Sequence, residues 1–427
     1  MFRKKMKEER ALDSSPTIHV EVRQSNKSTL PPRNVESLVD QMIKKMENLY
    51  GDCILNDFEP ELAQHVESVS ICDVDENLSN GKLVSLLSSR LHYHVYRLVD
   101  DEPSTEEIDD EQLSAASHWI LPSREFHGLW ESLIYDGEVK SQLLNFVSTT
   151  LLFSDRNVDS NVVSWNGVIL LHGPPGTGKT SLCKALAQKL SVRLGSRYSY
   201  GQLIEINSHS LFSKWFSESG KLVMKMFSKI RELIDDREAL VFVLIDEVES
   251  LAHARNSSAG GADPSDAVRA VNALLTQLDN IRRYPNVIIL TTSNITGAID
   301  LAFVDRADVK QYVGPPSASA IYHIYRSCIL ELQNVEIIAP KCVVLPLRQL
   351  NIASEIGENS FIGYSLRVKE LAKKSEGLSG RTLRRLPFLA HALFLQKPTT
   401  NLDNYLDALS KAIDKEFQDR NKLQNNF

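Results

Sequence analysis

Residues 173–180 have the types and spacing of a loop that binds phosphate. Their sequence is Gly173-Pro174-Pro175-Gly176-Thr177-Gly178-Lys179-Thr180, which fits G-x-x-x-x-G-K-[ST] between an apolar run and a helix-forming run. Glycines let backbone N–H groups surround a phosphate chain without Cβ clashes. Lys179 can reach the β and γ phosphates, and the Thr180 hydroxyl can ligate Mg²⁺. We therefore predict a nucleotide site that also includes Ser181; the alternative is a chance glycine-rich turn.

Two adjacent carboxylates, Asp246 and Glu247, follow the apolar run at 240–245. Desolvating carboxylates at the end of a buried strand is costly unless a cation lies there. A Mg²⁺ ion held through Asp246 would meet this requirement. Glu247 could polarise the water that attacks the γ-phosphate. The alternative is a pair of acids that ends a strand in solvent.

An amide, Asn294, follows a further apolar run that begins at Val287. In a parallel sheet the carboxyl end of this strand lies on the same edge as Asp246, where ligands bind. Asn294 could therefore hydrogen-bond the γ-phosphate or the attacking water. The alternative is a helix cap.

The elements that must position these residues alternate along the chain. Apolar runs lie at 168–172, 203–206, 240–245 and 287–290, and helical patterns lie at 181–190, 217–234 and 265–278. This alternation predicts a parallel sheet that is buried on both faces. Helical patterns at 126–135 and 138–153 come before it. After Gly314–Ser317 nearly everything reads as helix as far as Lys415.

The N-terminal part has a different pattern. It holds strand-like runs at 17–23 and 91–97 and an amphipathic helix that Asn34 could cap. Residues 100–111 then carry eight acidic and no basic side chains, which favours a linker, or alternatively an acidic docking tail. We predict four regions, in order a small α+β N-terminal domain, an acidic linker, a large α/β domain and a small helical domain. Their bounds are 1–99, 100–116, 117–316 and 317–427.

Composition limits the classes of protein that remain. The chain has 427 residues, a net charge of −7 and 42% hydrophobic residues, as in an ordinary globular protein. The acidic balance argues against a generic nucleic-acid binder. Five scattered cysteines support neither a disulfide framework nor a zinc site. The charged start of the chain does not resemble a secretory signal, so a soluble intracellular protein is expected.

Taken together and in this order, the motifs resemble those of the AAA+ ATPases. The resemblance covers about 117–427 and makes 173–180 a Walker A motif, Asp246 and Glu247 a Walker B motif, and Asn294 a sensor 1 residue. It implies an α/β P-loop domain with a C-terminal helical lid, bound ATP and Mg²⁺, and ATP hydrolysis.

Three further segments resemble subfamily features of AAA+ proteins. Trp215, Phe216 and Ser217 stand where remodelling enzymes carry an aromatic pore loop, although packing of the two aromatic rings in the core is the alternative. Arg381 resembles sensor 2, with a surface arginine as the alternative. Arg306 resembles an arginine finger that acts on the neighbouring subunit; an intramolecular pair with a nearby aspartate, either Asp305 or Asp308, is its alternative.

Longer stretches resemble the pachytene checkpoint protein 2 family. They read NSHSLFSKWFSESGK, LIDEVESL, TTSNIT, FVDRADVKQYVGPPS and GLSGRTLRRLPFLAHALF. The resemblance implies a homohexamer that opens closed HORMA-domain proteins, either directly or through an adaptor bound by the N-terminal domain. It also implies roles in meiotic chromosome-axis regulation and the spindle assembly checkpoint, in the nucleus, at chromosomes and kinetochores, and in the cytoplasm, without a membrane or direct nucleic-acid partner.

Two departures from general AAA proteins accompany this resemblance. Asp305 replaces the first of two common finger arginines, and Ser217 replaces a pore-loop glycine. Two alternative functions stay open from the motifs: a nucleic-acid-stimulated AAA+ motor or clamp loader, and a nucleotide-dependent scaffold that turns over negligibly.

Overall fold

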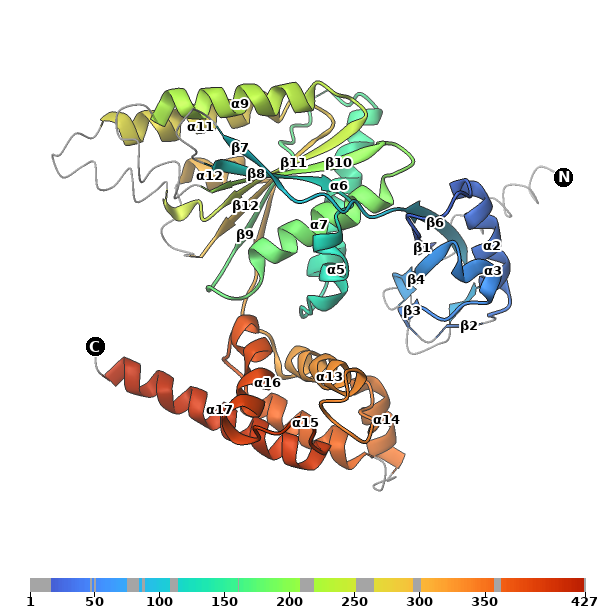
Figure 1. The fold of residues 1–427 in the computed structure, drawn as a ribbon. Coiled ribbons are helices and arrows are strands. Elements are labelled where there is room, and N and C mark those ends of the chain that lie inside the picture. Colours follow the sequence, from blue (N-terminus) through green and yellow to red (C-terminus); the bar gives the residue numbers. More distant parts are fainter. Residues whose placement is uncertain are drawn as a thin grey trace.

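The computed structural model contains three bodies in chain order: an N-terminal α+β domain, a central α/β domain and a C-terminal helical domain (Figure 1). It describes residues 17–46, 48–49, 51–74, 84–86, 89–107, 114–159, 161–207, 219–250, 265–294, 301–356 and 362–425. Among these residues, no helix is long and apolar enough to cross a membrane.

The N-terminal domain is a four-stranded sheet with the order β3-β4-β1-β6. Its strands are β1 (Thr17–Gln24), β3 (Cys53–Leu55), β4 (Val66–Cys72) and β6 (Arg90–Tyr96), and its helices are α2 (Pro32–Lys44) and α3 (Pro60–Ala63). A short pair, β2 (Asn48–Leu49) with β5 (Val84–Ser85), lies beside it. The apolar stripe of α2 packs on one sheet face. Its N-cap is Pro31 and not the expected Asn34, because Pro32 already holds the helical φ at the first helical position, two residues before Asn34.

The central domain is a seven-stranded sheet with the order β13-β9-β12-β11-β10-β8-β7. Five strands are parallel: β9 (Val168–His172), β10 (Tyr200–Asn207), β11 (Ala239–Asp246), β12 (Val287–Ser293) and β13 (Val309–Tyr312). The predicted parallel sheet is therefore confirmed. Its central strand β11 is apolar from Ala239 to Ile245 because helices cover both of its faces, and only its last residue, Asp246, is charged.

The segment predicted as a linker is partly incorporated into this sheet. β7 (Ser104–Glu107) pairs with β8 (Ser114–Leu121), and β8 pairs antiparallel with β10. Acidic composition was a misleading guide here, because an edge strand pairs through its backbone and leaves one side in water. The prediction of a linker at 100–116 is therefore wrong for β7 and for the first residues of β8, which belong to the central sheet.

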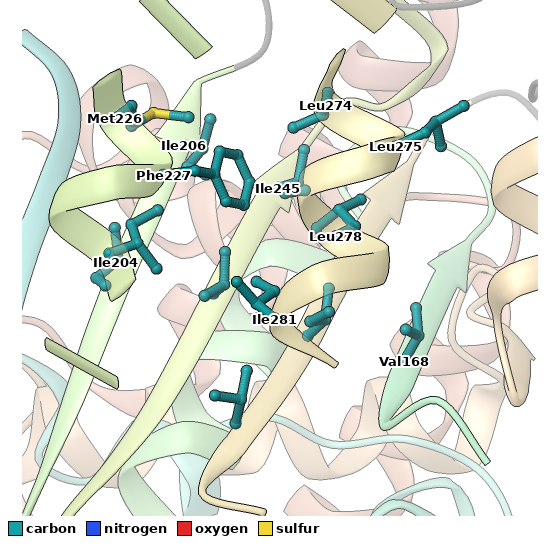
Figure 2. Close-up of a cluster of buried hydrophobic side chains, with 14 of the residues drawn as sticks. Val168, Ile204, Ile206, Met226, Phe227, Ile245, Leu274, Leu275, Leu278 and Ile281 are labelled. Atoms are coloured by element: carbon teal, nitrogen blue, oxygen red, sulfur yellow. The ribbon is translucent and has the colours of Figure 1, made fainter. Parts of the chain in front are cut away.

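Two layers of helices enclose the central sheet. α9 (Ser219–Ile234) and α11 (Ser265–Ile281) cover one face, and α6 (Val139–Asp155) and α7 (Lys179–Arg193) cover the other. Figure 2 shows Phe227 of α9 beside Ile206 and Leu278 of α11 beside Ile245, in one cluster of helix and strand side chains. The segment predicted as one helix at 126–135 is instead a 3-10 turn, η3 (Arg124–Phe126), and a short helix, α5 (Leu129–Ser132), separated by Gly128 in a left-handed conformation.

The C-terminal domain is a bundle of five helices within the described residues. They are α13 (Ala318–Asn334), α14 (Leu347–Ile356), α15 (Gly363–Lys374), α16 (Gly380–Phe394) and α17 (Leu402–Asn425). α12 (Leu301–Arg306) and β13 lead from the central domain toward it. Ser317 caps α13 and is fixed to the central domain, because Asp136 accepts hydrogen bonds from its backbone N–H at 2.9 Å and from its hydroxyl.

Candidate nucleotide-binding and catalytic site

The phosphate-binding loop joins β9 to α7, and its glycines are required by its shape. Gly173, Gly176 and Gly178 all have positive φ, of 147°, 77° and 90°. A Cβ on Gly173 would lie 2.2 Å from the carbonyl oxygen of Val313, which no side chain can do. The loop thus turns tightly against the segment that leads to the lid, and the N–H of Gly173 donates to the Ser293 carbonyl at 3.2 Å. Left-handed residues in such a loop turn backbone N–H groups toward a bound anion.

Lys179 opens α7 and is buried, with 4% of its surface exposed. Its Nζ donates hydrogen bonds to the carbonyl oxygens of Gly173 at 3.0 Å and Pro174 at 2.8 Å. Burial lowers the pKa of Lys179, and the nearby carboxylates of Glu249 and Asp246 oppose that shift. The ammonium is therefore held at the mouth of the loop, where phosphate oxygens would meet it.

Thr180 and Asp246 bring oxygen atoms from two motifs together. The Thr180 hydroxyl donates to Asp246 Oδ1 at 2.9 Å, and the Thr292 hydroxyl donates to the same oxygen. A hydroxyl beside a carboxylate is the oxygen donor set that Mg²⁺ takes when phosphates complete its shell. These residues consequently fit a magnesium–nucleotide complex.

Glu247 and Asn294 meet at the edge of the sheet that the sequence predicts. Asn294 Nδ2 donates to Glu247 Oε1 at 3.2 Å, and the Glu247 backbone N–H donates to Thr292 Oγ1 at 3.2 Å. Glu247 has a φ of 57°, an uncommon conformation for a glutamate. A backbone strained in this way persists only where surrounding contacts hold it. The Glu247 backbone is therefore constrained, and this fixes the position of its carboxylate.

The lid contributes the far wall of the site. The Arg381 backbone N–H donates to the carbonyl of Gly176 at 3.0 Å, and both residues line a cavity of about 370 Å³. The cavity lies between the loop, Tyr135, Gly314 and the lid. The Tyr135 hydroxyl donates to the Gly178 carbonyl at 3.1 Å, and burial raises its pKa, so it stays a neutral donor. A base and sugar attached to the phosphates would enter this cavity.

Arg306 lies away from this cluster. Its Nε and Nη2 donate to Asp279 at 3.0 and 2.8 Å, and its carbonyl accepts from Asn166. Asn166 precedes β9, whereas the phosphate loop follows it, so a strand of five residues, about 16 Å, separates them. The intramolecular partner that the structure gives Arg306 is thus Asp279, where the sequence suggested Asp305 or Asp308. The geometry excludes contact between Arg306 and the phosphates of its own chain.

Some predicted functional residues lie outside the described residues, and sequence reasoning missed others. The predicted pore-loop residues Trp215, Phe216 and Ser217 belong to the first group. Thr292 and Glu249 were missed, although both border recognised motifs. Glu249 is buried and accepts a hydrogen bond from the Asn294 backbone N–H at 3.1 Å. Only their positions in the sequence could have indicated Thr292 and Glu249. Each is a polar residue within three positions of the end of a strand at the catalytic edge of the sheet.

Family models match the chain over most of its length. The TRIP13 N-terminal domain model matches residues 13–101. The model of the ATPase family associated with various cellular activities (AAA) matches 169–315, and the TRIP13-like AAA+ ATPase lid C-terminal domain model matches 317–417.

Curated relatives and a solved structure agree with these matches. The pachytene checkpoint protein 2 homologs of Rattus norvegicus and Homo sapiens are each 58% identical over 412 residues, covering 96% of this chain and 95% of theirs. The structure of C. elegans PCH-2 is 37% identical with a TM-score of 0.77 and covers 94% of this chain and 100% of that one. A chain of the E. coli MS115-1 HORMA:CdnC:Trip13 complex shares the fold at 17% identity, with a TM-score of 0.51 over 72% of this chain and 97% of its own.

Proposed function

The chain belongs to the pachytene checkpoint protein 2 (TRIP13) family of AAA ATPases, and from this premise we propose that it is a homohexamer that uses ATP hydrolysis to open HORMA-domain proteins. The position of Arg306 is the observation that supports assembly into an oligomer. Arg306 lies away from the phosphate loop of its own chain, so in the role of a finger it would act on a neighbouring subunit, and the complete site would then need at least two copies. The HORMA client is supported by the E. coli complex, whose name pairs a Trip13 chain with a HORMA protein.

The hydrolytic chemistry follows from the residues around the loop. Lys179 and the loop amides bind the phosphates, and Thr180 and Asp246 would hold Mg²⁺, which neutralises charge on the phosphoryl oxygens when bound. Glu247 orients and polarises the attacking water, and Asn294 fixes the Glu247 carboxylate. Arg306 of an adjacent subunit stabilises the charge of the transferring group.

Motion is transmitted through the lid. Arg381 contacts the loop through Gly176, and Ser317 ties α13 to Asp136, so a change at the phosphates alters the angle at Gly314–Ser317. We propose that this rotation moves Trp215 and Phe216 along a central pore. Aromatic side chains there could pull a polypeptide without reading its sequence, because they bind through area and shape.

The cellular setting is part of the same proposal. The relatives are named pachytene checkpoint proteins, which supports a role in a meiotic checkpoint. We further propose roles in meiotic chromosome-axis regulation and in the spindle assembly checkpoint, on the resemblance of the motifs alone. Such roles would place the protein in the nucleus, at chromosomes and kinetochores, and in the cytoplasm. The adaptor and the particular client would be bound by the N-terminal domain.

The deciding experiment compares the wild-type protein with Trp215→Ala on a closed HORMA-domain protein. We expect the variant to keep basal phosphate release and to lose ATP-dependent opening of the client. Retained opening would move the gripping role to other residues. Stimulation of hydrolysis by DNA but not by a HORMA-domain protein would favour a nucleic-acid motor, and negligible phosphate release in every oligomeric state would favour a scaffold.

A further inference from the structure

The sheet of the N-terminal domain has a polar face that lies against the helix following the phosphate loop. Along β1, residues Ile18, Val20 and Val22 enter the domain core, so the alternating residues, including His19 and Glu21, face the other way. That face meets α7 and α5 of the central domain, beside which Figure 1 places it. Contact between the two domains is thus made by polar side chains.

Lys189 of α7 is the centre of this contact. Its Nζ donates to Glu21 Oε2 at 2.7 Å, to Glu131 Oε1 at 3.1 Å and to Cys72 Sγ at 3.5 Å. The side chains of Lys189 and Glu21 are only 4% and 6% exposed. Glu21, Cys72 and Glu131 are spaced closely enough to hold a metal ion, but the ammonium of Lys189 already serves as their cation.

Arg193, one helical turn further along α7, completes the network. Its Nε donates to Glu21 Oε1 at 3.1 Å, and its Nη1 lies 2.9 Å from Asp73 Oδ2. One buried carboxylate therefore bridges two cations that project from the same face of α7. We call Glu21, Asp73, Lys189 and Arg193 the interdomain charge network.

The network requires all of its members. Burial alone would raise the pKa of Glu21, but Lys189 and Arg193 together outweigh it and hold that pKa below its ordinary value. Burial alone would lower the pKa of Lys189, and Glu21 leads the groups that raise it instead. Removing one member of a buried ion pair leaves an uncompensated charge, which is strongly unfavourable. Without Glu21, two neighbouring buried cations would have to separate or reach water.

The same helix carries both the network and the phosphate-binding residues. α7 runs from Lys179 to Arg193 with no break, a length of about 22 Å for 15 residues. Its first turn presents Lys179 and Thr180 to the nucleotide, and its last two turns present Lys189 and Arg193 to the N-terminal domain. A packed helix moves as a unit, so a displacement at one end is transmitted to the other.

We propose that Lys189 and Arg193 are positioning residues that couple docking of the N-terminal domain to nucleotide binding. The docked domain holds the C-terminal end of α7, and this fixes the loop in the geometry that phosphates require. Nucleotide therefore binds more tightly when the domain is docked, and by reciprocity bound nucleotide strengthens docking. The proposal rests on the AAA nucleotide site alone and does not depend on the identity of the client.

The test measures ADP affinity by calorimetry in the full-length chain. Glu21→Gln keeps the size of the side chain and removes its charge, and we expect the ADP dissociation constant to rise at least about fivefold, the low end of coupling between distant sites. Glu59→Gln is the control, because it also removes one carboxylate of the N-terminal domain, and the partner of Glu59 is Lys45 of the same domain, at 3.6 Å. It should bind ADP as the wild type does.

Rescue separates coupling from damage. Glu21→Gln/Lys189→Met removes the uncompensated cation and leaves Arg193 with Asp73, so it should unfold in urea near the wild-type midpoint, whereas its ADP dissociation constant should stay raised because the interdomain contact is still missing. Hydrogen exchange of α7 and β1 should slow when ADP is added to the wild type and not to Glu21→Gln. If Glu21→Gln does not fold, Asp73→Asn should give a smaller rise in the same direction. Unchanged ADP affinity in a folded Glu21→Gln or Asp73→Asn protein overturns the proposal.

Discussion

The side-chain amide of Asn294 donates a hydrogen bond to Glu247 Oε1 over 3.2 Å, joining the residues that follow two adjacent strands, β12 and β11. The Glu247 backbone is in turn held by Thr292 of β12. One strand thus fixes both the position and the orientation of the carboxylate on the next. This arrangement suits a base that must face one water at the γ-phosphate.

Glu247→Gln should retain nucleotide binding and lose hydrolysis. Glutamine can still accept from Asn294, so the geometry of the site should persist while the base is lost. We expect phosphate release to fall by about 10²- to 10⁴-fold, with ATP affinity near that of the wild type. Steady-state phosphate release and nucleotide titration check this. Turnover within a few-fold of wild type would remove Glu247 from the role of base.

Arg306→Ala should abolish most hydrolysis without weakening nucleotide binding to its own chain. Arg306 lies at the end of the sheet opposite the phosphate loop, so its removal leaves the loop unchanged. A finger supplied in trans typically contributes about 10³- to 10⁵-fold in turnover. The measurement is phosphate release at saturating ATP, accompanied by sedimentation to show assembly.

Mixing subunits tests whether the finger acts in trans. Arg306→Ala subunits keep an intact loop, and Lys179→Ala subunits keep an intact finger, so mixed assemblies should regain part of the activity. Arg282→Ala is a matched control, because Arg282 also lies near Asp279, at 3.5 Å, and has no proposed catalytic role. No recovery on mixing would argue against a finger supplied by the neighbour.

The architecture was predictable where burial determines the pattern. The run at 168–172 coincides with β9, and the runs within β10, β11 and β12 fall inside the observed strands, because strands covered on both faces must be apolar. The loop at 173–180 and the partners Glu247 and Asn294 were found because their spacing is set by phosphate and water chemistry. Their catalytic roles remain predictions.

Features formed by backbone pairing or by distant side chains could not be predicted. β7 pairs through its backbone within an acidic segment, which composition cannot reveal. Arg306 pairs with Asp279, 27 residues away, and Glu21 with Lys189, 168 residues away. No local pattern marks such partners, since they are brought together only by the packing of whole elements.

Gly176→Ala should weaken nucleotide binding by disturbing the contact between loop and lid. A Cβ there would lie 2.9 Å from Ser379 Oγ, and the φ of 77° is unfavourable for alanine. Ser379 caps α16, so the added methyl group pushes on the start of the helix that carries Arg381. We expect about a tenfold loss of ATP affinity, equivalent to about 1.4 kcal/mol.

Gly363→Ala is the control for this change. Gly363 lies in the first turn of α15, and a Cβ there would meet nothing within 4 Å. Since alanine also favours helix, this variant should bind ATP as the wild type does and be no less stable. Equal ATP affinities for the two variants would show that the lid does not close on the loop through Gly176.

The stability of the chain should fall as the pH is lowered from about 6.5 to about 4, because His19 and His94 are held neutral. His19 Nδ1 and His94 Nε2 are 2.8 Å apart, which requires one donor and one acceptor, so two doubly protonated rings cannot keep this contact. Burial, with the adjacent Arg193 guanidinium, lowers the pKa of His94 to about 4 and that of His19 to about 3. Both pKa values lie below the ordinary value of 6.5 in the unfolded chain.

Between these pH values the unfolded chain binds protons that the folded chain does not, so unfolding becomes easier as the pH falls. Each histidine can change the free energy of unfolding by at most about 1.4 kcal/mol per pH unit within that window. His94→Gln removes one of the two groups and leaves His19 a partner that can donate or accept. Urea unfolding at pH 7, 6, 5 and 4.5 should therefore show a shallower loss of stability for His94→Gln than for the wild type. Parallel curves for the two proteins would mean that His94 is not held neutral by the fold.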